Sequence, residues 1–560
     1  MPSVRSSDAP APAKGGAGIL KSAAVVGAMT MLSRVLGLAR EQLMAHFFGI
    51  SALKSAFDVA FTVPNLFRRL FGEGALSSAF IPVFGETARR KSAAEAFAFG
   101  ARVLTLLFCA LGLIVAVAVA AAFALERVAP EGSAWPATLP LARIMLPYAL
   151  LICLAAILSG MLNSFGRFAV SSFTPLILNM VWIGAIFAAA RFCGGDSPEA
   201  EMRRLEVVAW SVVAAGFLQF AFQLPALFRL GFRFALRLKG IFADEKIRRV
   251  LRLMAPAALG MGLVQVNVCV DKVLALWAAD YAPAALEYAE RIIYLPLGVF
   301  ATAFTTVLLP AFTTMAAADE KAEIGEEAER AFRNLFFVMI PGTFIVLLLA
   351  EPLVHLLYSF KGGAFARDPD ASLLAGRALA CYAPGLAVFC AQKVLAPVYY
   401  AFQDVKTPLK ISMGCLVLNV VLNVVSVMLL PDGWKHTGIA GSTVVCSAVN
   451  GFFLFALLKR HGVRVRVKGV AAAALRFAAA AAPTAFAARW AWLSLPRLSG
   501  FVRIAPDGLP ESKGAEAAAA ACAFAAAAAV YFALVAVFSR KDAAAAFSAI
   551  RRRRRPRAGR

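Results

Sequence analysis

The chain has 560 residues, 61% of them hydrophobic, and a formal net charge of +24. This composition excludes a single soluble globule, because apolar runs of about 20 residues recur along the sequence and each can cross a bilayer as a helix. The charge alone would suit a nucleic-acid-binding protein, but most basic residues lie in segments between or after the apolar runs, as in a polytopic membrane protein.

The predicted fold class is all-α, with about 14 transmembrane helices. Residues 1–18 are rich in Pro, Ala and Ser and are expected to be a disordered tail without the features of a secretory signal. The expected spans are 20–48, 54–84, 100–125, 137–161, 172–192, 207–228, 250–279, 285–316, 333–360, 371–402, 408–430, 437–458, 468–494 and 514–538.

Basic residues are distributed asymmetrically between the two faces. The loop 229–252 holds eight, the loop 459–468 five and the tail from Arg540 nine, whereas the loops 126–136 and 279–284 together hold one Arg. This positive-inside pattern predicts that both termini are cytoplasmic. The basic loops are expected to contact anionic lipid headgroups rather than nucleic acid.

The motifs of an enzyme or a metal protein are absent from the sequence. The nine cysteines are single residues without ligand spacing, which argues against a disulfide framework or a zinc site. No Gly-rich phosphate loop and no Gly-x-Ser-x-Gly motif next to a strand is found. A transporter without an ATP-driven motor is therefore expected.

An internal repeat divides the chain. Thr174-Pro-Leu recurs as Thr407-Pro-Leu (407 − 174 = 233), Ile81-Pro-Val-Phe as Leu309-Pro-Ala-Phe (309 − 81 = 228), and Arg40-Glu41 falls opposite Asp271-Lys272 (271 − 40 = 231). Two halves of six helices each are expected, related by an axis along the membrane normal, with a substrate site between them. The expected domains are 1–18 (tail), 19–228 (N-lobe), 229–249 (basic linker), 250–458 (C-lobe), 459–539 (two terminal helices) and 540–560 (basic tail).

Charged residues inside the apolar helices are the main functional signal. A charge at bilayer depth costs at least about 2.5 kcal/mol and therefore requires a partner, a hydrated cavity or a ligand. The first span contains Arg34, Arg40 and Glu41, and one ion pair can neutralise only one of these two arginines. The other charged candidates are Arg68, Arg69, Glu73, Glu290, Arg291 and Lys393. Arg69 and Glu73 are spaced to pair at i, i+4, which leaves Arg68 without a local partner.

Two interpretations of these charges remain open. They could form interhelical salt bridges without any ligand. Cations outnumber acids, however, and Arg is suited to bidentate recognition of phosphate, so an anionic substrate is predicted.

A second group of residues offers oxygen ligands. Asp271 follows Asn267 at i, i+4, and Asn419 and Asn423 have the same spacing. Such oxygens suit a sodium ion that could drive transport. Interhelical hydrogen bonding explains the same residues equally well.

Four segments together resemble one protein family: Met29–Arg40 (MTMLSRVLGLAR), Val63–Ala75 (VPNLFRRLFGEGA), Lys393–Pro397 (KVLAP) and Gln403–Pro408 (QDVKTP). They resemble the MurJ (MviN) family of bacterial lipid II flippases, within the MOP transporter superfamily. The resemblance implies an inner-membrane protein for peptidoglycan synthesis that moves an undecaprenyl-diphosphate-linked precursor to the periplasmic leaflet by alternating access.

The resemblance also implies roles for individual residues. Arg34, Arg40, Arg68 and Arg291 would bind the diphosphate, with Glu41, Arg69, Glu73, Glu290 and Lys393 supporting the cavity. The terminal helices would form a groove for the polyprenyl tail. Asp271, Asn419, Asn423 and Thr443 fall where family members place a sodium site, membrane potential being the other candidate driving force; cell-wall synthesis proteins are possible partners.

Three positions depart from the family pattern. Glu41 replaces a common Asp, Ser55 stands where an acid often precedes the position of Asp58, and Tyr294 stands where an acid sometimes follows Arg291. Those acidic roles are not transferred to this chain. A flippase for another polyprenyl-diphosphate glycan, a multidrug exporter, a membrane-embedded lipid-modifying enzyme and a non-transporting scaffold remain as alternatives.

Overall fold

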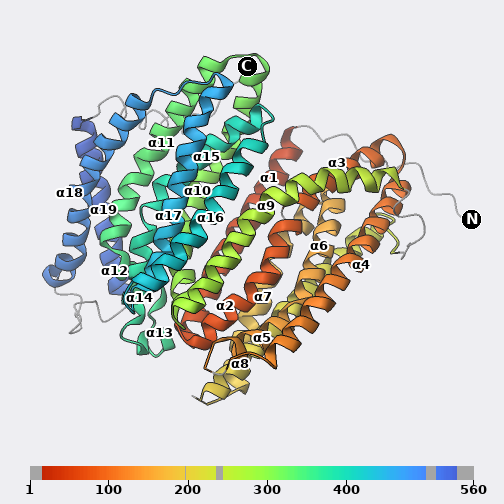
Figure 1. Cartoon of the computed structure of the whole chain (residues 1–560), viewed down its shortest axis with the longest axis horizontal. Coiled ribbons are helices and arrows are strands. Elements are labelled where there is room, and N and C mark those ends of the chain that lie inside the picture. Colours follow the sequence, from red (N-terminus) through yellow and green to blue (C-terminus); the bar gives the residue numbers. More distant parts are fainter. Residues whose placement is uncertain are drawn as a thin grey trace, which may run out of the picture. The chain divides into compact units, whose positions relative to one another are not determined.

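The computed structural model describes residues 16–72, 74–130, 132–195, 197–234, 244–499 and 513–538. Nearly all of these residues are helical, and no β-strand occurs within these ranges. The predicted all-α fold class is therefore confirmed. The chain divides into two compact units, Met1–Leu276 and Trp277–Arg560, each with its own set of packed helices (Figure 1).

The first unit is built from α1 to α9, with a short π-helical turn, η1, after α2. The bounds are α1 Gly16–Phe48, α2 Ala52–Phe67, η1 Arg68–Gly72, α3 Ala75–Arg90, α4 Ala93–Glu126, α5 Trp135–Met145, α6 Pro147–Ser164, α7 Phe168–Phe192, α8 Pro198–Arg229 and α9 Glu245–Ala278.

The second unit is built from α10 to α19, with one 3₁₀ turn, η3, after α17. The bounds are α10 Ala282–Ala317, α11 Lys321–Leu348, α12 Ala350–Tyr358, α13 Ala364–Arg367, α14 Ala371–Tyr382, α15 Gly385–Ala401, α16 Lys406–Leu429, α17 Lys435–Leu457, η3 Leu458–His461, α18 Val467–Ser499 and α19 Lys513–Phe538.

The predicted count of 14 spans is not confirmed. Within the described ranges, ten helices are long and apolar enough to cross a membrane, or eleven if α14 and α15, which meet at a 40° bend, form one span. The three predicted spans that are not among these helices are 20–48, 54–84 and 285–316. All three lie in helical segments, and span 54–84 is divided among α2, η1 and α3, of which α2 and α3 have 16 residues each.

Several predicted spans are broken helices. Span 137–161 is divided into α5 and α6 at Leu146, just before Pro147, and the bend between α14 and α15 lies at Ala383-Pro384. Proline lacks the backbone N–H that would continue the helical hydrogen-bond ladder, and its ring crowds the preceding turn. These breaks therefore follow from local sequence.

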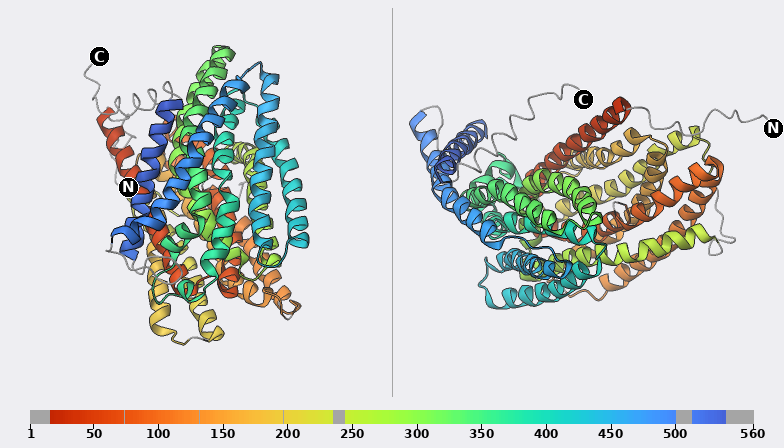
Figure 2. Two further views of the ribbon diagram at one scale, coloured as in Figure 1. Left: turned by 90° about the vertical axis from the view of Figure 1, so that its left-hand side faces the viewer. Right: turned by 90° about the horizontal axis from the view of Figure 1, so that it is seen from above.

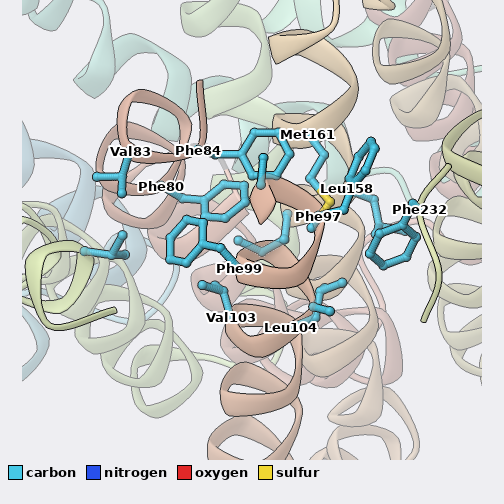
Figure 3. Close-up of a cluster of buried hydrophobic side chains, with 14 of the residues drawn as sticks. Phe80, Val83, Phe84, Phe97, Phe99, Val103, Leu104, Leu158, Met161 and Phe232 are labelled. Carbon is cyan, nitrogen blue, oxygen red and sulfur yellow. The ribbon is translucent and has the colours of Figure 1, made fainter. Parts of the chain in front are cut away.

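A cluster of buried hydrophobic side chains, several of them phenylalanines, forms part of the core of the first unit (Figure 3). Phe80 of α3 stacks on Phe99 of α4 with ring centroids 5.7 Å apart, and Phe97 stacks on Phe165 at 5.1 Å. Aromatic pairs at these separations attract each other beyond the area that they bury. The cluster fixes α3, α4 and α6 as one packed layer.

The two last helices pack on the second unit as a pair. α18 and α19 lie side by side, and α18 runs along α11 (Figures 1 and 2). Tyr531 of α19 donates a hydrogen bond to the carbonyl oxygen of Phe337 on α11 at 2.8 Å. A Cβ at Gly325 of α11 would lie 2.3 Å from the carbonyl oxygen of Arg464, so this glycine allows the segment before α18 to lie against α11.

Candidate functional site

The two arginines of α1 lie in different environments. Arg34 is exposed and forms no ion pair with any described residue. Arg40, six residues later, is only 9% exposed. Its Nη2 contacts Glu41 Oε1 at 2.6 Å, so the one available acid of α1 neutralises Arg40 and not Arg34.

Helix α7 supplies two further contacts to Arg40. Nη1 donates to Asn179 Oδ1 at 3.3 Å, and the guanidinium carbon lies 4.3 Å from the centroid of the Trp182 ring. Burial of a cation is tolerable here because a carboxylate, an amide oxygen and an aromatic face surround it. Neither α7 residue could be identified from the sequence, since both lie about 140 positions from Arg40 and have no local charge signal.

Arg68 and Arg69 begin the π-helical turn η1. Arg68 is half-buried, and its Nε donates to Asn65 Oδ1 at 2.9 Å, so the expectation that it lacks a local partner is wrong. Arg69 is exposed. Glu73, its predicted partner, lies outside the described residues. π-helical turns inside α-helices are frequent at functional sites.

The second unit contains the remaining basic candidates. Arg291 of α10 is half-buried, and its Nη2 lies 3.4 Å from Glu287 Oε1, one turn earlier. Glu290 accepts a hydrogen bond from the Tyr382 hydroxyl at 3.0 Å. The i, i+4 spacing of Glu287 and Arg291 is visible in the sequence and could have identified Glu287.

Lys393 of α15 is exposed, and its backbone carbonyl accepts a hydrogen bond from Thr305 Oγ1 at 3.3 Å. That bond joins α15 to α10 through main-chain atoms. The side chain of Lys393 forms no ion pair with any acid in the described ranges.

The residues predicted to bind sodium belong to both units. In the first, Asn267 Nδ2 donates to Asp271 Oδ2 at 3.1 Å on α9. In the second, the buried Asn423 donates to the buried Asn419 at 3.0 Å on α16, and Thr443 Oγ1 of α17 donates to its own helix backbone at 3.1 Å. The described residues hold no group of three or more His, Cys, Asp or Glu suited to a metal ion.

A buried ion pair that was not a candidate lies on α2. Lys54 is 1% exposed, and its Nζ donates to both carboxylate oxygens of Asp58 at 2.6 and 2.5 Å. The i, i+4 spacing predicts such a pair. Its burial could not be read from the sequence, since it depends on which face of α2 packs inward.

An apolar cavity of about 480 Å³ lies among α11, α15 and α18 of the second unit. Thr343 is its one polar lining residue, and the Thr343 hydroxyl has no hydrogen-bond partner among the described residues. The lining residues are Ile340, Thr343, Phe344, Pro384, Ala387, Ala471, Ala474, Leu475 and Ala478. Such a surface accommodates hydrocarbon rather than a charged group.

A basic cavity of about 490 Å³ lies at the beginning of α9 in the first unit. Its lining residues are Glu245, Lys246, Arg248, Arg249 and Arg252. Arg249 Nη1 contacts Glu86 of α3 at 2.9 Å, which ties this end of α9 to α3. Its lining residues lie in the first two turns of α9, so the C-terminal part of the basic segment 229–252, expected to be a loop, is helical.

Comparison with known proteins extends over most of the chain. The family model for the lipid II flippase MurJ matches residues 44–504. The lipid II flippase MurJ of Burkholderia cenocepacia is 32% identical over 452 residues, which cover 80% of this chain and 84% of that protein.

Two solved structures share the fold. A structure of the lipid II flippase MurJ in an inward closed conformation has a TM-score of 0.70 at 21% identity, covering 92% of this chain and 98% of its own. An inward-facing multidrug resistance MATE family transporter of the MOP superfamily has a TM-score of 0.61 at 15% identity, covering 79% and 99%. Because the family model also matches four-fifths of the sequence, this chain belongs to the lipid II flippase MurJ family.

Proposed function

We propose that this protein flips lipid II, the undecaprenyl-diphosphate-linked peptidoglycan precursor, from the cytoplasmic to the periplasmic leaflet of the bacterial inner membrane by alternating access. The match to the lipid II flippase family over residues 44–504 is the observation that supports it most. The protein is a transporter and not an enzyme in this proposal, because flipping forms and breaks no covalent bond.

Arg40 is the central diphosphate contact in this proposal. A buried guanidinium needs an anion beside it, and in the structure Glu41 supplies that anion at 2.6 Å. If a substrate phosphate replaces the Glu41 carboxylate, Arg40 has an anionic partner both before and after the substrate binds. Arg34, Arg68 and Arg291 add further positive charge, while Glu41, Arg69, Glu73, Glu290 and Lys393 support the cavity.

The apolar cavity among α11, α15 and α18 supports a place for the polyprenyl tail. Its lining includes four residues of α18, which in this proposal holds the hydrocarbon together with its neighbour α19 while the polar head crosses. Leaving the tail in an apolar environment avoids the cost of exposing it to water, about 0.8 kcal/mol for each CH₂ group.

The orientation and lipid surroundings also belong to this proposal. Both termini are cytoplasmic, so that the basic loops and the tail from Arg540 lie near anionic headgroups. The basic cavity at the start of α9 adds a concave surface for such headgroups on the first unit. Proteins of cell-wall synthesis are the proposed protein partners. They would act at the cytoplasmic face of the membrane or receive the flipped lipid II.

The driving force is proposed to be a sodium gradient or the membrane potential. Asp271, Asn419, Asn423 and Thr443 provide the oxygen atoms that sodium would need. Flipping in proteoliposomes, run with and without a sodium gradient and with imposed voltage of either sign, separates the two. A sodium-driven protein would lose gradient dependence, but not all activity, on substitution of Asn419 by Ala.

The test of the diphosphate site compares Arg40→Ala and Arg68→Ala with the wild type. Loss of a charge-assisted bidentate contact is expected to lower the rate of lipid II flipping about a hundredfold, while the amount of inserted protein stays normal. Flipping is measured in proteoliposomes, and growth is measured in cells depleted of their own flippase.

Arg90→Ala is the matched control, since Arg90 is 80% exposed and pairs with Glu86 on the surface. Normal growth of cells with either test variant, at wild-type protein level, would refute the assignment of that arginine. The same assay with another polyprenyl-diphosphate glycan tests the nearest alternative substrate. An exporter of cationic drugs is disfavoured because cations outnumber acids among the candidate residues.

A further inference from the structure

Asn179 and Trp182 lie one turn apart on α7, and both contact Arg40 of α1. Asn179 Oδ1 accepts from Arg40 Nη1 at 3.3 Å, and the Trp182 ring centroid lies 4.3 Å from the guanidinium carbon. Both residues are buried, Asn179 at 7% exposure and Trp182 at 3%. One helix therefore determines where the guanidinium of another can lie.

The Asn179 amide has a single favourable orientation. Its Nδ2 donates to the carbonyl oxygen of Ser33 on α1 at 3.1 Å, while its Oδ1 faces Arg40. The reversed amide would place an NH₂ group against the guanidinium and an oxygen against a carbonyl oxygen, both of which are repulsive. Asn179 is thus fixed to the α1 backbone and holds Nη1.

The Trp182 ring is held rigidly by two rings of α2. Phe57 and Phe61 meet it edge-on, with centroid distances of 5.5 and 5.1 Å and interplanar angles of 72° and 88°. Edge-to-face contacts of this kind restrict rotation of the ring. Trp182 therefore covers one face of the Arg40 guanidinium with a surface that attracts cations but accepts no anion.

These contacts leave one edge of the guanidinium for an anion. Nε and Nη2 point two N–H groups in parallel along that edge, the geometry that binds two oxygens of a phosphate. Glu41 contacts Nη2, whereas Nε is buried and has no hydrogen-bond partner among the described residues. A phosphate in place of the Glu41 carboxylate could satisfy both N–H groups at once.

We propose that Asn179 and Trp182 are positioning residues that hold Arg40 so that its Nε–Nη2 edge binds the diphosphate of the lipid substrate in exchange for Glu41. The inference rests on the proposed function. Asn179 accepts a hydrogen bond from Nη1 and Trp182 covers one face of the guanidinium, so neither competes with phosphate for the Nε–Nη2 edge. Arg40 need not reorient when the two anions exchange.

The experiment measures binding of undecaprenyl diphosphate to the full-length protein in lipid nanodiscs. Trp182→Leu and Asn179→Leu are each expected to weaken binding about tenfold, because each removes one restraint on a desolvated guanidinium. Trp182→Phe retains a ring face and is expected to stay within about threefold of the wild type. Trp210→Leu is the control, since Trp210 of α8 is 60% exposed.

A double-mutant cycle with Arg40→Lys tests whether the two residues act through Arg40. Lysine keeps the charge but has no two-donor edge, so adding Trp182→Leu or Asn179→Leu to it should change affinity less than about twofold. Thermal midpoints of all variants are measured in parallel. The Phe variant keeps the test informative if Trp182→Leu does not fold.

The outcomes are distinguishable. If the wild type neither binds undecaprenyl diphosphate nor flips lipid II, the proposed function fails and this inference falls with it. If the wild type binds but the α7 variants equal the Trp210→Leu control, or their effects add fully to Arg40→Lys, the positioning role is refuted while the function stands.

Discussion

Three charged side chains within the helices have an oppositely charged partner close in sequence. Glu41 is adjacent to Arg40, Asp58 lies one turn after Lys54, and Glu287 lies one turn before Arg291. A lone charge at bilayer depth is expensive, so a nearby opposite charge allows the helix to insert before it packs. Arg40 and Arg291 therefore each have a carboxylate partner in the structure, and in the proposed function the diphosphate of the substrate exchanges with the carboxylate at Arg40.

Asp404 offers a test of pH dependence outside the membrane-spanning segments. Its carboxylate accepts from the Thr407 backbone N–H and from His461 Nε2, each at 3.0 Å. Burial raises the pKa of Asp404, but hydrogen bonds from Thr407 and His461 outweigh it and hold the pKa below the usual 3.8. The folded state binds a proton at Asp404 less tightly than the unfolded state does. The ionised Asp404 carboxylate therefore stabilises the folded protein above about pH 3.8, and this stabilisation is lost as the pH falls through the lowered pKa.

Asp404→Asn should lower the thermal midpoint relative to the wild type near pH 6, and the difference should shrink between about pH 4 and pH 3. Thermal unfolding in detergent across this range measures it. Asp280→Asn, at an exposed position, is the control. A difference that stays constant down to pH 3 would contradict the assignment.

Helix α19 is joined to α12 by a buried ionic cluster of three side chains. Glu516, 1% exposed, contacts His355 Nδ1 with Oε1 and Lys513 Nζ with Oε2, each at 2.7 Å. Lys513 Nζ also donates to the carbonyl oxygen of His355 at 2.6 Å, in the last turn of α12. A cation there satisfies carbonyl groups that the helix leaves unpaired and is favoured by the helix dipole.

Glu516→Gln is expected to lower the free energy of unfolding by about 2 kcal/mol, because hydrogen bonds to charged groups are lost in a buried site. Denaturant unfolding of the purified protein provides the measurement. The control is Glu320→Gln, at an exposed position before α11. Equal stability of the two variants would show that the cluster does not hold α19 in place.

Helix boundaries were less predictable than helix existence. Periodicity and length identified almost every apolar helix, because a span must satisfy its backbone hydrogen bonds internally. Prolines 147 and 384 marked two of the breaks. The π-helical turn at Arg68 and the break between α11 and α12 at Leu349 were not predicted, although Pro352 follows that break by three residues and lacks the N–H that would continue α11.

The membrane topology of the whole chain can be tested at two helices that are not counted as spans within the described residues. These helices are α1 and α10, and the predicted arrangement requires both to cross. Reporter fusions ending at Ser51 and Asp280 are expected to report the periplasm, and fusions ending at Asp319 and in the loop 229–252 the cytoplasm. A cytoplasmic signal at Ser51, or a periplasmic one at Asp319, would contradict the fourteen-span arrangement.

The linear sequence was sufficient to identify a helical membrane protein, its family motifs and the charges that adjacent residues could pair. These properties depend on composition, periodicity and spacing within one helix. Only the folded structure decided that Glu41 pairs with Arg40 and leaves Arg34 exposed, that Asn179 and Trp182 enclose the same guanidinium, and that α11, α15 and α18 leave an apolar cavity. Contacts between helices distant in sequence depend on which faces pack together, and in a membrane nearly every face is apolar enough to serve.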